Sequence, residues 1–259
     1  MSAPRWLAER VEADEVWFRI GRAGERLIAE WPGLCTLTAR PDGSEAELSP
    51  VPGASEVTLE KVRRGAAYAL VESLRGKTSL HAGAVAMNGA AIVLVGRNHA
   101  GKSSAVADLC AQGAQLLADD IAVIGGSAAE RVVEPTERHH WLGEASRAAF
   151  GVGLPGGGEE DKHPLYALDV CATPMKLRAI VALEFADGAP HLTRMAGIEA
   201  MGRLLPSVVR FALDDPDRSR EELGRLVDLI DGVPFYLLER PRDLTRIREA
   251  GVLLEGLLT

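Results

Sequence analysis

The chain contains few cysteines and few aromatic residues, and each scarcity excludes a class of protein. Its three cysteines, Cys35, Cys110 and Cys171, are far apart and lie outside any Cys-x-x-Cys or Cys/His spacing. They therefore indicate neither a disulfide framework nor a zinc site. Aromatic residues make up 5% of the 259 residues, which argues against a stacking platform for single-stranded nucleic acid.

Basic residues are also in the minority, with 29 Lys and Arg against 37 Asp and Glu and a formal net charge of −8. Proteins that bind the phosphate backbone of nucleic acids present clustered basic surface, so a nucleic-acid partner is not expected. Lysine is especially rare. It occurs only at positions 61, 77, 102, 162 and 176.

The chain lacks a long hydrophobic run. Its most apolar window, 82–95, is interrupted by Asn88-Gly89 and is shorter than the roughly 20 residues that span a bilayer. The first ten residues include charged side chains and no continuous apolar segment, which argues against a signal peptide. We therefore expect a soluble, cytoplasmic protein with no membrane partner.

With 47% hydrophobic residues, the chain can form a full core. Residues 1–55 predict short strands, with a turn at Pro41-Asp42-Gly43, and the apolar spacing over 58–74 predicts a helix with Thr58 as its N-cap. We expect a β-rich N-terminal region with a helix over 1–78 and a second domain over 79–259, although the two could form one continuous globule.

The central segment predicts a strand hairpin, a loop, a helix and a further strand. Apolar runs at 82–86 and 91–95 flank Asn88-Gly89, the strongest short signal for a hairpin. A glycine-punctuated loop precedes a helix over 103–112, and Leu116-Leu117-Ala118 forms a short buried strand. Further strands are predicted at 177–185 and 235–238, helices at 221–230 and 244–257, and a mobile loop at 151–158. The fold class is α/β with a mixed sheet.

The sequence Gly96-Arg97-Asn98-His99-Ala100-Gly101-Lys102-Ser103 fits the Walker A pattern of a phosphate-binding loop (P-loop). Glycines let backbone N–H groups surround a phosphate, Lys102 neutralises its charge and the Ser103 hydroxyl is a Mg²⁺ ligand. The following helix directs its positive N-terminal end at the phosphates. The candidate nucleotide-binding residues are Gly96, Asn98, His99, Ala100, Gly101, Lys102, Ser103 and Ser104. An ordinary glycine-rich turn would not explain why one of the rare lysines stands here.

Asp119-Asp120 follows the short buried strand, one helix after the loop. Neighbouring residues on an extended segment point to opposite faces. One carboxylate could therefore face the metal and phosphate, while the other faces the acceptor or packs structurally. Taken without the loop, such a pair is more typical of a solvated strand end.

The sequence alone leaves the roles of three further positions open, namely His81, His139-His140 and Lys162. If the hairpin continues without a bulge, opposed residue numbers sum to 177 and His81 faces Gly96, although a lone histidine is usually structural. The pair His139-His140 is interpreted as surface or loop residues. Lys162 follows the glycine-rich segment and is either a lid residue or a solvated charge.

Taken together, His81-Ala-Gly-Ala-Val, the hairpin, the Gly-x-x-x-x-Gly-Lys-Ser loop and Leu116-Leu-Ala-Asp-Asp resemble the kinase domain of HPr kinase/phosphorylase and its relatives. The resemblance covers about residues 79–124. It implies a P-loop fold closer to phosphoenolpyruvate carboxykinase than to the all-parallel nucleoside kinases. It also implies multimers, and transfer of a phosphoryl group from a nucleotide or pyrophosphate to a serine hydroxyl.

The resemblance also implies roles for individual residues. Lys102 and Ser103 would hold phosphate and Mg²⁺, Asp119 would be the general base, and Asp120 and His81 would complete the site, with Asp120 as a further metal ligand. Ser104 departs from the glutamate of the bifunctional members, and a segment linked to their dephosphorylation reaction has no counterpart here. HPr as the acceptor, and the reverse reaction, therefore stay open.

We expect an ATP- and Mg²⁺-dependent kinase that acts on a serine hydroxyl of a peptide or small protein, as the peptide-tailoring relatives do. Two alternatives remain: a kinase for a small alcohol such as free serine, and a nucleotide-binding regulatory module without catalysis. Homo-oligomerisation is possible, since the apolar C-terminal helix could form an interface or dock on its own core.

Overall fold

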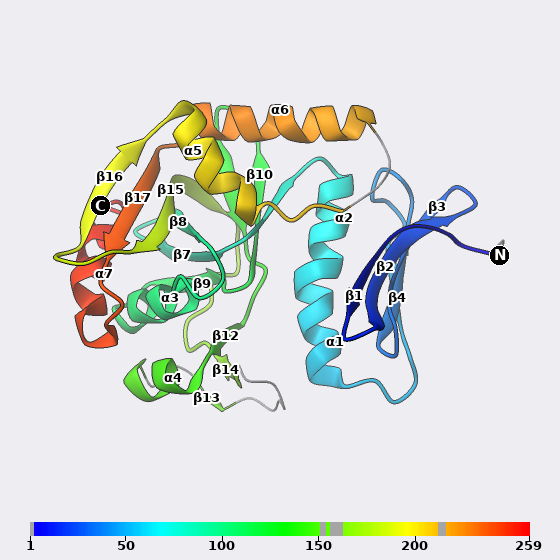
Figure 1. Cartoon of the computed structure of the whole chain (residues 1–259), viewed down its shortest axis with the longest axis horizontal. Helices are drawn as coiled ribbons and strands as arrows, with labels where there is room; N and C mark the ends of the chain where they lie inside the picture. The colour runs from blue at the N-terminus through cyan, green and yellow to red at the C-terminus, as the bar shows by residue number, and fades with distance from the viewer. Residues whose placement is uncertain (1–2, 151–153, 156–162, 212–215) are drawn as a thin grey trace. The chain divides into compact units, whose positions relative to one another are not determined.

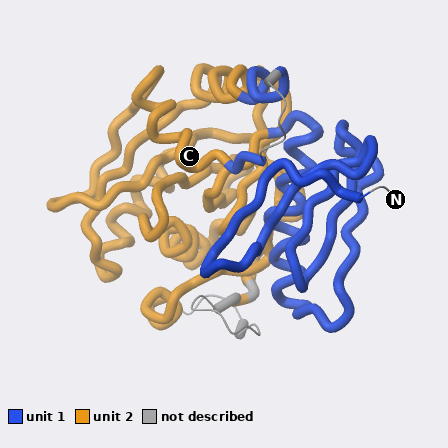
Figure 2. Tube along the Cα trace, turned by 45° about the vertical axis from the view of Figure 1, so that its right-hand side comes forward, with its two compact units in different colours: residues 1–77, 209–222 blue, residues 78–208, 223–259 orange. Residues whose placement is uncertain are grey.

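A computed structural model describes residues 3–150, 154–155, 163–211 and 216–259 of the chain. The fold is mixed α/β, and the chain divides into two compact units (Figure 2). The first unit comprises 1–77 and 209–222, and the second comprises 78–208 and 223–259. The first unit's second segment thus lies outside the 1–78 region expected from the sequence.

The first unit contains a five-stranded antiparallel sheet in which each strand pairs with the next along the chain. In the fourth strand the buried residues Cys35, Leu37 and Ala39 alternate with partly exposed ones, which is the period expected of a sheet with one covered face, whereas the second and third strands also bury consecutive residues. The strands are β1 (Arg5–Glu12), β2 (Glu15–Ala23), β3 (Arg26–Trp31), β4 (Cys35–Ala39) and β5 (Glu47–Pro50).

A helical segment covers this sheet. It consists of α1 (Glu56–Val62), a π-helical turn over Arg63–Ala67, and α2 (Tyr68–Leu74). Its apolar side chains share one core cluster with those of β2–β4. The prediction of Thr58 as the N-cap is wrong. Ser55 caps the helix, and its hydroxyl accepts hydrogen bonds from the Thr58 N–H (3.4 Å) and the Thr58 hydroxyl (3.1 Å).

The capping contact predicts that Ser55→Ala lowers the free energy of unfolding of the first unit by about 1 kcal/mol, because an N–H of the first turn loses its acceptor. Thr58→Ala leaves that backbone acceptor in place and should cost less. Amide exchange in α1, measured for both variants, compares them directly. A larger effect of Thr58→Ala would contradict this assignment of the cap.

The second unit is built on a mixed sheet that has nine strands among the described residues. The path β6-β10-β11-β15-β8-β7-β9 carries β17 on β15 and β16 on β17. Strand β15 is parallel to β8 and β17, and the other pairs are antiparallel. The strands are β6 (Thr78–His81), β7 (Gly83–Met87), β8 (Ala90–Val95), β9 (Gln115–Ala118), β10 (Ile121–Gly126), β11 (Arg131–Glu134), β15 (Met175–Phe185), β16 (His191–Met195) and β17 (Phe235–Arg240).

Helices pack on both faces of this sheet (Figure 1). Strand β8 shows why, because Val93 and Val95 belong to one core cluster and Ile92 and Leu94 to the other. Helices α3 (Lys102–Ala111) and α7 (Ile247–Glu255) complete the second cluster. Helices α5 (Gly197–Leu204) and α6 (Pro216–Gly232) complete the first. Short 3₁₀ turns occupy 205–207 and 244–246.

The predicted hairpin is present, and its register is the predicted one from Met87↔Ala90 to Gly83↔Leu94. The extension of this register to His81 and Gly96 is wrong. Pairing with β8 ends at Gly83, and His81 lies in the separate strand β6, opposite Ile121 of β10. The chain therefore changes partner strands within two residues, which moves His81 to the segment that follows Asp119-Asp120.

A small three-stranded sheet adjoins α3, and its strands are β12 (His139–Leu142), β13 (Leu154–Pro155) and β14 (His163–Tyr166). Helix α4 (Glu144–Phe150) follows β12 along the chain. The interpretation of His139-His140 as surface or loop residues is wrong, since both lie on β12 and His140 is only 1% exposed. Lys162 and most of the expected loop at 151–158 lie outside the described residues.

Across the described part of the chain, none of the helices combines the length and apolar character needed to cross a membrane.

Candidate nucleotide and phosphoryl-transfer site

The glycine-punctuated loop joins the buried strand β8 to the first turn of α3, as predicted from the sequence. Its backbone takes positive φ angles at Gly96 (152°), His99 (63°) and Gly101 (83°). At Gly101 the left-handed backbone favours glycine, and a Cβ atom there would displace the Arg240 guanidinium, since it would lie 2.1 Å from Nη2. The loop residues 97–99 are exposed, whereas Lys102 at the start of α3 is 8% exposed.

The Lys102 ammonium group lies over the loop. Its Nζ donates hydrogen bonds to the carbonyl oxygens of Gly96 (3.0 Å) and Arg97 (3.3 Å). The charge is thus held beside the loop carbonyls, at the N-terminal end of α3, where both the helix and the lysine would stabilise an anion.

Arg240, at the end of β17, braces the other end of the loop. Its Nη2 donates to the carbonyl oxygens of Ala100 (3.2 Å) and Gly101 (3.4 Å), and its guanidinium lies 4.8 Å from the centroid of the Phe185 ring. Arg240 is 3% exposed. Burial lowers its pKa, and the nearby Asp108 carboxylate opposes that effect. Nothing in the local sequence marks this arginine, because it lies more than 130 residues from the carbonyls that it holds.

Asp119 follows β9 and is buried beside the N-terminus of α3. Its Oδ2 accepts a hydrogen bond from the backbone N–H of Trp141 (2.7 Å), and the Ser103 hydroxyl hydrogen-bonds to the same carboxyl group. Desolvation by burial raises the pKa of Asp119 well above its usual value, although both hydrogen bonds oppose this shift. The Oδ1 atom is buried and has no hydrogen-bond partner.

His140 lies near the same carboxylate oxygen, with its Nδ1 4.0 Å from Asp119 Oδ2. Burial lowers the pKa of His140 to about 4. The imidazole is therefore neutral near pH 7 and gives the carboxylate no compensating positive charge. The site keeps Asp119 in a place where a cation would be strongly favoured.

Asp120 lies with Asp119 in the bend between β9 and β10, and its side chain is accessible where that of Asp119 is buried. Its Oδ1 lies 3.2 Å from Nδ1 of His81, and both side chains are accessible, at 37% and 39% of their surfaces. The backbone reinforces the contact, because the N–H of Ala82 donates to the carbonyl oxygen of Asp120 (3.0 Å). The two aspartates thus divide between a buried side and an accessible side.

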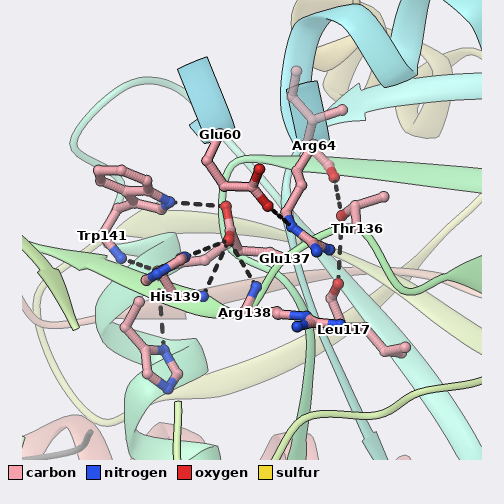
Figure 3. Close-up of polar contacts among 11 residues, drawn as sticks. Glu60, Arg64, Leu117, Thr136, Glu137, Arg138, His139 and Trp141 are labelled. Carbon is pink, nitrogen blue, oxygen red and sulfur yellow. Dashed lines mark hydrogen bonds and ion pairs between the residues drawn. The ribbon is translucent and has the colours of Figure 1, made fainter. Parts of the chain in front are cut away.

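Glu137 organises the segment that holds Asp119 (Figure 3). Its Oε1 accepts hydrogen bonds from the backbone N–H groups of Arg138 (2.7 Å) and His139 (3.1 Å), and lies 3.2 Å from Nδ1 of His139. Its Oε2 accepts the Trp141 indole N–H (2.9 Å). Burial alone would raise the pKa of Glu137, but these donors lower it below its usual value. Glu137 therefore fixes the strand whose Trp141 N–H binds Asp119.

The residues present fit a magnesium ion that is carried mainly by phosphate oxygens and water. The buried Asp119 Oδ1 has unused acceptor capacity, and it belongs to the carboxyl group that binds the Ser103 hydroxyl. Among the described residues, no group of three or more His, Cys, Asp or Glu side chains could form a metal site from protein ligands alone. Mg²⁺ in nucleotide sites needs only one or two such ligands.

Most of the sequence-predicted site residues lie around this one region. Ser104 contacts α4 instead, because its hydroxyl shares a hydrogen bond of 2.9 Å with the hydroxyl of Ser146. Sequence reasoning missed Glu137, His140 and Arg240. In the sequence, Glu137 is an ordinary charged residue before the pair His139-His140, and nothing in that pattern predicts that it is buried.

Comparison with known proteins finds likeness only among solved structures, 48 chains of which match. No protein-family model matches the chain, and no curated protein matches it. A solved structure described as the Hpr(Ser) kinase/phosphatase from Coxiella burnetii is similar over 69% of this chain and 96% of that one, with 12% identity and a TM-score of 0.37.

Burial of the Asp119 carboxylate predicts that Asp119→Asn raises the free energy of unfolding at pH 7. The folded state binds a proton more tightly than the unfolded state, so stability falls as pH rises from the unfolded pKa toward the raised folded one. The difference between the variant and the unmodified chain should therefore be small at about pH 4 and grow toward pH 7. Denaturant titrations at both pH values measure it, with the exposed Asp187→Asn as control. A less stable Asp119→Asn variant at pH 7 would count against this reading.

The Glu137 contacts predict that Glu137→Gln destabilises the second unit by about 1–3 kcal/mol, because the neutral amide is a weaker acceptor and its NH₂ group faces the Trp141 N–H. The exposed Glu130→Gln is the matched control and should change stability by less than about 0.5 kcal/mol. Trp fluorescence during unfolding reports both variants. Equal stabilities for Glu137→Gln and the control would show that the Glu137 hydrogen bonds do not stabilise β12.

Proposed function

We propose that this chain is an ATP- and Mg²⁺-dependent kinase that transfers a phosphoryl group to a hydroxyl group. The observation that carries the proposal is the division of Asp119 and Asp120 at one end of the loop. One carboxyl group is buried against Ser103, and the other is accessible beside His81. A site that only binds phosphate has no need of the second group.

The donor side consists of the loop and the start of α3. Backbone N–H groups of the loop and the N-terminus of α3 surround the phosphates, and Lys102 neutralises their charge. Mg²⁺, held by Ser103 and Asp119, would supply further positive charge to the phosphates. The hydrogen bond between these two residues favours Asp119 over Asp120 as the metal-side carboxylate, in contrast to the roles expected from the family resemblance.

The acceptor side consists of Asp120 and His81. An acceptor hydroxyl at this position attacks the γ-phosphorus, the bond from that phosphorus to the β,γ-bridging oxygen breaks, and ADP leaves. Asp120 takes the hydroxyl proton, and His81, 3.2 Å away, orients its carboxylate. Asp119 does not fill this role, because its carboxyl group is already bound to the Ser103 hydroxyl and the Trp141 N–H on the donor side. Rate enhancement comes mainly from positioning and from electrostatic stabilisation of the transferred group.

The proposed acceptor is a serine hydroxyl of a peptide or small protein, as the sequence resemblance implies. A small alcohol such as free serine uses the same chemistry and differs only in the pocket. Incubation with labelled ATP and a panel of serine-containing peptides, free serine and HPr identifies the acceptor. Label on none of these, together with intact nucleotide binding, would favour a regulatory module that binds nucleotide without transferring it.

The loop predicts that Lys102→Ala lowers phosphoryl transfer by at least about a hundredfold while the protein stays folded, since the charge on the phosphates loses its counter-ion. Lys176→Ala, at an exposed position of β15, is the matched control and should retain full activity. The ATP-turnover rate and far-UV circular dichroism are the two readouts. Full activity in Lys102→Ala would exclude the proposed function.

The accessible aspartate predicts a different signature. Asp120→Asn should lower the transfer rate by about 10²–10⁴-fold and leave the affinity for ATP within a factor of about three, because the lost group acts on the acceptor. Single-turnover transfer and equilibrium binding of ATP separate these effects. Equal loss of binding and transfer would place Asp120 on the donor side instead.

A further inference from the structure

The buried guanidinium of Arg240 has no part in the chemistry proposed above. Arg240 ends β17, is 3% exposed, and donates from Nη2 to the carbonyl oxygens of Ala100 (3.2 Å) and Gly101 (3.4 Å). Its Nε atom is buried and has no hydrogen-bond partner. Removing a charge from water is costly, and an apolar side chain often fills such a place at a lower cost. The retained charge at this position therefore calls for a role.

The carbonyl groups that Arg240 holds determine where the adjoining N–H groups point. A trans peptide unit is planar, and its C=O and N–H bonds point in opposite directions. Because the carbonyl oxygens of Ala100 and Gly101 are turned toward Arg240, the N–H groups of Gly101 and Lys102 are turned away from it. These two N–H groups lie at the start of α3, where phosphate binds in the proposed site. Arg240 thus orients two phosphate-binding donors without contacting the phosphate.

The carboxylate of Asp108 offsets part of the cost of burying Arg240. Asp108 lies on α3 and is 4% exposed. Burial lowers the pKa of Arg240, and the charge of Asp108 raises it. Asp108 also contacts α7, where its Oδ2 lies 3.3 Å from Nη1 of Arg248. Arg248 is 38% exposed and pairs with Glu255 at 2.6 Å, so its charge is compensated without Asp108. The buried arginine is therefore the one that depends on this carboxylate.

Gly251 gives a second, independent observation, because it leaves room for the Asp108 carboxylate inside α7. A Cβ atom at Gly251 would lie 2.2 Å from Oδ2 of Asp108, so a side chain there would displace the carboxylate. The neighbouring Ala250 and Leu254 belong to the core cluster that α7 shares with α3. A glycine inside a helix costs about 1 kcal/mol relative to alanine. The helix therefore gives up stability at the point where Asp108 needs space.

From the held carbonyl groups, the two buried opposite charges and the space at Gly251, we infer that Asp108 and Arg240 are a positioning pair that controls the affinity of the loop for phosphate. Asp108 keeps the guanidinium buried against the loop, and Arg240 keeps the N–H groups of Gly101 and Lys102 directed at the phosphate. The inference rests on the proposed function in placing phosphate at the loop. It goes beyond that function by assigning control of phosphate affinity to two residues that touch no substrate.

The test measures the affinity of the full chain for ATP and for inorganic tripolyphosphate, each with Mg²⁺, together with the unfolding temperature. Arg240→Met removes the donors and should weaken both probes at least about tenfold, and Asp108→Asn, which keeps the side-chain shape, should weaken both at least about threefold. In the double variant, Asp108→Asn should add less than about a twofold loss to that of Arg240→Met, because it acts through Arg240. Arg240→Lys retains a charge and a donor, and should bind both probes more tightly than Arg240→Met. The matched control is Arg248→Met, which removes the other partner of Asp108 and should leave both affinities unchanged.

Each other outcome is decisive. Unchanged affinity in Arg240→Met or Asp108→Asn, even with a lower unfolding temperature, would assign that residue to stability alone and overturn the pair. Additive losses in the double variant, or no recovery in Arg240→Lys, would also overturn it. Equal losses in Arg248→Met and Asp108→Asn would show that Asp108 acts through the packing of α7. If Arg240→Met does not fold, Arg240→Lys takes its place in the same comparison with Asp108→Asn. Binding of neither probe by the unmodified chain would contradict the proposed function, whereas normal binding with unaffected variants would contradict the positioning pair alone.

Discussion

The buried carboxylate of Asp119 is the constraint on which the candidate site depends. Removing a carboxylate from water is costly unless charge and hydrogen bonds compensate it, and here the neighbouring His140 is neutral near pH 7. The backbone N–H of Trp141 and the Ser103 hydroxyl offset part of this cost, and one carboxylate oxygen stays without a partner. A fold that retains such a group gives up stability for a position that suits a cation.

Several elements of the second unit surround the Asp119 carboxylate. Strand β9 ends at the carboxylate, α3 begins beside it with Lys102 and Ser103, and Glu137 holds the small strand that supplies the Trp141 N–H. Arg240 holds the carbonyl end of the loop from β17. These elements are far apart in the sequence, and the mixed sheet brings them together. The accessible pair of Asp120 and His81 lies next to Asp119, at the start of β10.

Local patterns predicted the parts of the site that are local. The Asn88-Gly89 turn fixed the hairpin and its register, and the Gly-Lys-Ser pattern placed the loop between a strand and a helix. The predictions that were wrong concern residues whose positions depend on strands far away in the sequence. Continuing the hairpin register placed His81 opposite Gly96, because sequence alternation cannot show that His81 belongs to a separate strand, β6, which pairs with β10. The burial of His140 depends on a separate small sheet, and the role of Arg240 depends on a strand near the C-terminus.

The most direct measurement of the central claim is the dependence of nucleotide affinity on Mg²⁺, by calorimetric titration of ADP with and without the ion. The account predicts that Mg²⁺ strengthens ADP binding to the unmodified chain, and that Asp119→Asn binds ADP alone as well as the unmodified chain does but loses the gain from the ion. If Asp119→Asn keeps the full gain, the buried carboxylate does not serve a cation, and the account is contradicted.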